Sequence, residues 1–116
     1  MDEYNVGNPF DPNTEIGPMA RHDLRDALHA QVTACVEQGA KILLGGKVPK
    51  QTGWYYPPTV LSRVTKGMPA YDDEMFGPVA AVIGVKNERE AIKVANDTPF
   101  GLGAAIFTKN RKHARD

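Results

Sequence analysis

Three consecutive acids are the densest group of potentially reactive side chains in the sequence. Asp72, Asp73 and Glu74 lie in the stretch YDDEMFGPVAAVIGV, residues 71–85, just before an apolar run. Two carboxylates can act together as general acid and base in hydrolysis. Adjacent side chains on an extended segment point to opposite faces, however, and rarely converge on one bond. The residues alone favour solvated loop acids with Phe76 as a core anchor, and a carboxylate hydrolase stays open as the less favoured alternative.

Cys35 and a group of polar residues near it, His22, Asp26 and His29, could also react or bind. A nucleophilic thiol needs a lowered pKa, as at a helix N-terminus or beside a histidine. Cys35 instead falls in the last turn of a predicted helix, on its apolar side, which indicates a buried core residue. The two histidines and Asp26 share a helix face and could hold a metal, but without a fourth ligand nearby an exposed polar face is favoured.

Neither glycine-rich stretch fits a nucleotide-binding loop. GLGAAI (101–106) lacks the third glycine and leads into a predicted strand, and GGKVPK (45–50) lacks the spacing of a phosphate loop. The aromatic run 54–56 could stack on nucleic acid. The 14 basic and 14 acidic residues cancel, however, which argues against a nucleic-acid or anionic-membrane partner. We expect partial burial or an oligomer contact for these rings.

The first half of the chain predicts a loop, a helix and two extended segments. Residues 1–20 are rich in proline, glycine and asparagine, which indicates a loop. A helix over about 21–38 is predicted by one apolar face, formed by Leu24, Leu28, Val32, Cys35 and Val36. The short apolar run AKILLGG (40–46), which ends at Gly45 and Gly46, predicts a buried strand. Residues 54–64 contain Pro57 and Pro58, which indicate an edge strand or an extended loop.

The second half predicts a strand, a helix and a further strand. Residues 79–85 are apolar on both alternating faces, which is typical of a strand covered on both sides. Asn87 and Glu90 have the spacing of a capping box for a helix to about residue 95. Residues 104–108 predict another strand, so 79–108 has the spacing of a right-handed βαβ crossover. Asn110 could cap a last helix. The sequence predicts an α/β fold with a partial parallel sheet and flanking helices.

The composition is that of one globular domain. The chain has 116 residues, of which 41% are hydrophobic, and no apolar stretch approaches the ~20 residues that span a bilayer. The first residues lack a signal core, and a single cysteine fits a reducing compartment, so we expect a cytoplasmic protein without membrane contact. Because the predicted sheet has few strands, we expect the chain to be part of something larger.

Five motifs in order resemble the NAD(P)-dependent aldehyde dehydrogenase family. They are VGNPFDPNTEIGP (6–18), EQGAKILLGG (37–46), YYPPTVL (55–61), EMFGPV (74–79) and EAIKVANDTPFGLGAAIFT (90–108). The second is similar to the end of a family helix and its following strand. The sequence of residues 55–83 resembles the bacterial succinate-semialdehyde dehydrogenase branch of the family. Together the motifs cover about 100 residues.

The resemblance implies that residues 1–116 are an incomplete part of one aldehyde dehydrogenase catalytic domain. In the family the motif glutamate accepts hydrogen bonds from the nicotinamide ribose and the motif phenylalanine places the nicotinamide ring. By position these residues are Glu74 and Phe76. The resemblance implies NAD or NADP as cofactor, an aldehyde such as succinate semialdehyde as substrate, and a homo-oligomer.

The catalytic machinery of the family lies outside these motifs. The family's nucleophilic cysteine and general-base glutamate precede the first motif, and Cys35 is not in the nucleophile's context. We therefore expect no catalytic residue and no metal ligand in this chain, and no activity from it alone. A free-standing interaction module derived from such a domain is the alternative.

Overall fold

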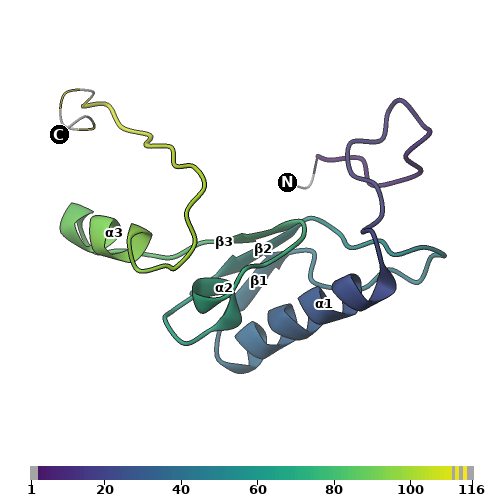
Figure 1. Cartoon of the computed structure of the whole chain (residues 1–116), viewed down its shortest axis with the longest axis horizontal. Coiled ribbons are helices and arrows are strands. Elements are labelled where there is room, and N and C mark those ends of the chain that lie inside the picture. The colour runs from purple at the N-terminus through teal and green to yellow at the C-terminus, as the bar shows by residue number, and fades with distance from the viewer. Residues whose placement is uncertain (1–2, 111, 113, 115–116) are drawn as a thin grey trace.

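The computed structural model describes residues 3–110, 112 and 114, and the predicted α/β class is confirmed. Figure 1 shows the elements in chain order: α1 (His22–Glu37), β1 (Lys41–Leu44), β2 (Thr59–Ser62), α2 (Pro69–Asp72), β3 (Val79–Ala81) and α3 (Glu88–Ala95). Within this described part of the chain, no helix is long and apolar enough to cross a lipid bilayer.

The three strands form a small mixed sheet in the order β1-β2-β3. β1 runs antiparallel to β2, with Ile42 opposite Leu61, and β2 runs parallel to β3, with Val60 opposite Ala80. The predicted parallel pairing thus holds for β2 and β3. β1 pairs antiparallel because residues 45–58 contain no helix that would carry the chain back for a parallel pairing.

The position of β2 corrects the interpretation of residues 54–64 as an edge strand or loop. β2 is the central strand of the sheet. Pro57 and Pro58 precede it and therefore remove no donor from its ladder. The first residue of the strand, Thr59, donates its N–H to the carbonyl oxygen of Pro78 at 2.8 Å.

The predicted strand at 104–108 is wrong, and with it the βαβ crossover over 79–108. β3 ends at Ala81, and Val82 and Val85 are partly exposed rather than covered on both faces. Residues 104–108 pair with no strand in the part of the chain that the structure describes. A β-forming sequence needs a neighbouring strand to satisfy its backbone groups, and no strand formed by the described residues lies beside this one. The helix predicted after Asn110 falls mainly outside the described residues.

α1 supplies one half of the core. The predicted helix is confirmed, and its apolar face buries Leu28, Val32 and Cys35, which are 2%, 1% and 0% exposed. Figure 1 shows α1 lying along the sheet, below β1 and β2. The buried cluster is completed by residues of β2 and of the loops around it, which are Ala40, Tyr56, Leu61, Val64 and Met68.

The cap predicted for α3 is confirmed. The Asn87 side chain accepts a hydrogen bond from the Glu90 N–H at 3.0 Å. The Glu90 carboxylate in turn accepts from the N–H of Lys86 at 2.6 Å, one residue before the cap. Reciprocal bonds of this kind satisfy N–H groups that have no partner inside the helix.

Candidate functional site

The acidic cluster begins inside a short helix. Pro69 starts α2, where its fixed φ and missing N–H are tolerated, and Asp72 ends it. The Asp72 carboxylate accepts a hydrogen bond from the Gly67 N–H at 2.9 Å. Asp72 and Asp73 are exposed, as the sequence predicts, but Asp72 also closes the turn that leads into α2.

Short backbone hydrogen bonds shape the segment that follows Glu74. The Gly77 N–H donates to the carbonyl oxygen of Met75 at 2.8 Å, and the Val79 N–H donates to that of Gly77 at 2.7 Å. These two narrow turns follow one another directly, and the chain then enters β3 beside β2. Glu74 and Phe76 are thus held on a tight segment between α2 and the sheet.

α1 lies directly under this segment. A Cβ atom at Gly77 would collide with Cδ2 of the buried Leu28 and would lie 3.4 Å from Cε of Met19. The backbone of Gly77 is not left-handed, so the need for glycine here is steric. The backbone at Gly77 therefore approaches α1 closely. The Gln31 side-chain amide also donates to the Glu74 carbonyl oxygen at 3.2 Å.

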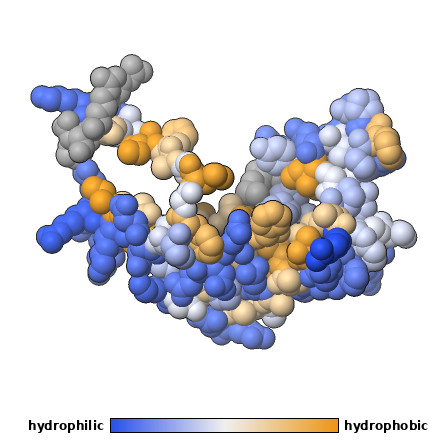
Figure 2. Space-filling model, in the orientation of Figure 1, coloured by the Kyte–Doolittle hydropathy of each residue, from blue (hydrophilic) through white to orange (hydrophobic). Residues whose placement is uncertain are grey.

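The side chains of Glu74 and Phe76 are both exposed. The Phe76 ring is 69% exposed, and the Glu74 carboxylate makes no hydrogen bond or ion pair with any residue that the structure describes. Glu74 borders an open hollow of about 920 Å³, whose remaining wall is formed by residues 95, 96 and 98–104. Figure 2 shows hydrophobic side chains along the extended segment that continues from this wall toward the C-terminus. A carboxylate without a partner can accept from two neighbouring hydroxyls, and an exposed ring can lie against a planar group.

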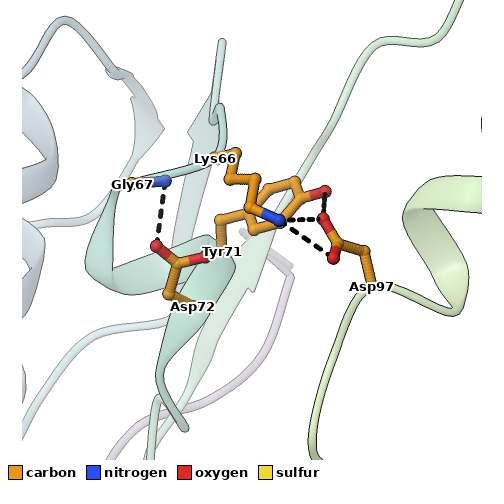
Figure 3. A network of polar contacts seen from close by, with 5 residues as sticks. All are labelled: Lys66, Gly67, Tyr71, Asp72 and Asp97. Carbon is orange, nitrogen blue, oxygen red and sulfur yellow. Dashed lines mark hydrogen bonds and ion pairs between the residues drawn. The ribbon is translucent and has the colours of Figure 1, made fainter.

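Figure 3 shows a polar cluster of Lys66, Tyr71 and Asp97, which joins the turn after α3 to α2 and to the loop before it. Lys66 Nζ donates to both carboxylate oxygens of Asp97, at 3.0 and 2.7 Å. The Tyr71 hydroxyl donates to one of the same oxygens at 3.0 Å. Because 26 and 31 residues separate Asp97 from these partners, no local sequence signal could have indicated the cluster.

The cluster changes the protonation equilibria of its members. Hydrogen bonds from Lys66 and Tyr71 hold the pKa of the Asp97 carboxyl below its usual value. The hydrogen bond and charge of Asp97 raise the pKa of Lys66. Burial, followed by the bond to Asp97, raises the pKa of Tyr71. At neutral pH the cluster therefore consists of a carboxylate, an ammonium and a neutral phenol.

Cys35 and the histidines of α1 have structural surroundings, as the sequence favours. Cys35 is buried, its Sγ accepts from the Ala70 N–H at 3.2 Å, and burial raises the pKa of the thiol. His29 Nδ1 lies 3.1 Å from the Tyr56 hydroxyl, and the His22 ring packs against Trp54. No three His, Cys, Asp or Glu residues among those described are grouped so that they could hold a metal ion.

Comparison with known proteins decides the family. The sequence model described as Aldehyde dehydrogenase family matches residues 1–116. This chain belongs to the aldehyde dehydrogenase family. The succinate semialdehyde dehydrogenase (NAD(P)+) Sad of Escherichia coli strain K12 is 52% identical over 110 residues, which are 95% of this chain and 24% of that protein. The succinate-semialdehyde dehydrogenase (NADP(+)) of Mycobacterium leprae strain TN is 47% identical over 115 residues, 99% of this chain and 25% of that protein.

Solved dehydrogenase structures share this fold. Succinic semialdehyde dehydrogenase from Streptococcus pyogenes, solved with NADP+, superposes with a TM-score of 0.91 at 35% identity, over 98% of this chain and 25% of that one. Betaine aldehyde dehydrogenase from Staphylococcus aureus, solved with NAD+, gives 0.90 at 35% identity, over 98% and 24%. This aldehyde dehydrogenase chain spans about a quarter of the length of the curated relatives that it matches.

Proposed function

We propose that this chain is part of an enzyme that oxidises an aldehyde to the carboxylic acid with NAD(P)+, and that the aldehyde is succinate semialdehyde. The observation that carries the proposal is the exposed carboxylate of Glu74, which bonds no described residue and lies two residues before an exposed aromatic ring in a chain of this family. The substrate is proposed because relatives at 52% and 47% identity carry that name.

The residues on the tight segment fit a nicotinamide cofactor, which supplies the acceptor for the hydride. Glu74 would accept hydrogen bonds from two neighbouring ribose hydroxyls, because both its carboxylate oxygens lack a protein donor among the described residues. Phe76 would restrict the orientation of the nicotinamide ring by contact with its own exposed ring. Related proteins are named or solved with NAD+ or NADP+, and we propose either cofactor here.

The nucleophile of the reaction must come from another part of the enzyme. Cys35 is the only cysteine of this sequence, and it is buried with a raised thiol pKa. A buried thiol of this kind supplies neither thiolate nor access to an aldehyde. We therefore propose that residues 1–116 contribute one wall of the cofactor site and do not oxidise aldehydes alone. We further propose a cytoplasmic homo-oligomer, without a nucleic-acid or membrane partner.

Glu74→Gln in the complete dehydrogenase tests the proposal. The amide keeps the size of the side chain but loses the charge that strengthens hydrogen bonds from the ribose, so kcat/KM for NAD(P)+ should fall by roughly 10- to 100-fold. Steady-state kinetics with varied cofactor and saturating aldehyde measure the change. Asp73→Asn is the matched control, since it removes an exposed charge one residue away. Equal kinetics for wild type and Glu74→Gln would refute the assignment.

A further inference from the structure

α1 contacts residues 70–77, the segment that contains Glu74 and Phe76, at three regularly spaced points. Cys35 Sγ accepts from the N–H of Ala70 at 3.2 Å. One helical turn earlier, Gln31 donates to the carbonyl oxygen of Glu74 at 3.2 Å. Three residues earlier again, Leu28 packs against the Cα of Gly77 so closely that a Cβ would collide with it.

The spacing of these contacts is the same on both sides. Cys35, Gln31 and Leu28 of α1 contact Ala70, Glu74 and Gly77, respectively. From one contact to the next, α1 moves back by four and then three residues, while the facing segment moves forward by the same numbers. Residues three and four apart share one face of a helix. That face therefore supports the segment from the start of α2 to the turn before β3.

Gln31 is the contact that acts on Glu74 directly. The acidic side chain of Glu74 has no protein partner among the described residues, so nothing holds the carboxylate itself. Its direction depends on the Glu74 backbone, whose carbonyl oxygen is bonded to the half-buried Gln31 side chain. The two bonded residues are 43 positions apart in the chain, and their bond lies between the contacts of Cys35 with Ala70 and of Leu28 with Gly77.

We propose that Gln31 is a positioning residue for Glu74: its amide orients the peptide from which the cofactor-binding carboxylate projects. This inference rests on the proposed function of Glu74. Loss of the amide leaves the buried face of α1 intact, because Leu28, Val32 and Cys35 supply its packing. The effect should therefore appear in cofactor binding and not in folding.

Gln31→Met in the complete dehydrogenase is the test, since methionine keeps the length and removes the donor. We expect the KM for NAD(P)+ to rise about 3- to 10-fold, as the loss of one neutral hydrogen bond predicts, with the KM for aldehyde and the melting temperature unchanged. Gln31→Lys returns a donor at similar reach and should recover at least half of the loss on a logarithmic scale. Gln38→Met is the matched control, because Gln38 is the C-cap of the same helix and its side chain bonds no described residue.

A double-mutant cycle with Glu74→Gln separates this inference from the proposed function. If Gln31 acts through Glu74, Gln31→Met should change the KM for NAD(P)+ less than about twofold in the Glu74→Gln background. An equal effect in both backgrounds would overturn the positioning role, as would an unchanged KM in Gln31→Met while Glu74→Gln raises it. No effect of Glu74→Gln itself would overturn the proposed function, and the inference with it. If Gln31→Met fails to fold, Gln31→Leu repeats the cycle.

Discussion

Gly77→Ala should destabilise the fold through a collision with α1. The new Cβ would overlap Cδ2 of Leu28, lie 3.5 Å from its Cδ1, and lie 3.4 Å from Cε of Met19. The end of the Met19 side chain can move aside. Leu28 is 2% exposed and packed among core residues, so its methyl group must shift by about an ångström against its neighbours. Forced packing of this kind costs about 1–3 kcal/mol of unfolding free energy.

Urea unfolding of the purified chain measures the cost, with Trp54 as the reporter. Trp54 is the only tryptophan of the sequence, and its ring lies 5.3 Å from that of His22 on α1. A loss of about 2 kcal/mol at a slope of about 1.5 kcal/mol per molar urea moves the midpoint down by about 1 M. Gly84→Ala is the matched control, because nothing lies within 4 Å of its added Cβ and its φ is ordinary.

Combining Leu28→Ala with Gly77→Ala tests whether the collision with Leu28 causes the loss of stability. Leu28→Ala alone should cost about 2–5 kcal/mol because it leaves a cavity in the core. In the Gly77→Ala background the new methyl group occupies part of that cavity, so the double variant should be more stable than additivity predicts by about 1–2 kcal/mol. Additive losses would refute the steric account. So would a loss in Gly77→Ala no larger than in Gly84→Ala.

Two further outcomes follow from the pKa shifts. Asp97→Asn should lower Tm by roughly 2 to 4 °C at pH 7, because Lys66 and Tyr71 lose their carboxylate. Since the pKa of Asp97 is lowered on folding, its contribution is present above the ordinary value near pH 4 and disappears as pH falls through the lowered value. The difference in Tm between wild type and Asp97→Asn should therefore shrink below about pH 4 in thermal scans, and a constant difference down to pH 2 would contradict it. The Cys35 thiol should react with an aromatic disulfide reagent at least about 100-fold more slowly in the folded chain than in urea, because burial raises its pKa and blocks access. Equal rates would show that Cys35 is accessible.

Much of the fold could be predicted because its signals are local. The apolar face of α1 and the Asn87–Glu90 cap depend on residues three or four apart, and both are present. The strand predicted at 104–108 failed because strand formation depends on a partner, and no strand lies beside these residues in the described part of the chain. The interpretation of residues 54–64 from Pro57 and Pro58 was wrong for a related reason. A proline weakens a strand only where its missing N–H would have bonded a neighbouring strand, and the paired residues begin after both prolines, at Thr59.

The sequence by itself determined the family, the α1 helix and the identity of Glu74 and Phe76 as candidate cofactor contacts, because residue types in a fixed order carry that information. Only the tertiary structure decided what holds these residues. Gly77 lies on Leu28, Gln31 bonds the Glu74 backbone, and Asp97 is bonded by Lys66 and Tyr71. The partners of Glu74 and Gly77 are 43 and 49 residues away in the chain, and those of Asp97 are 31 and 26 away. Packing of α1 against the sheet and the turn after α3 bring them together, and no pattern of neighbouring residues contains that geometry.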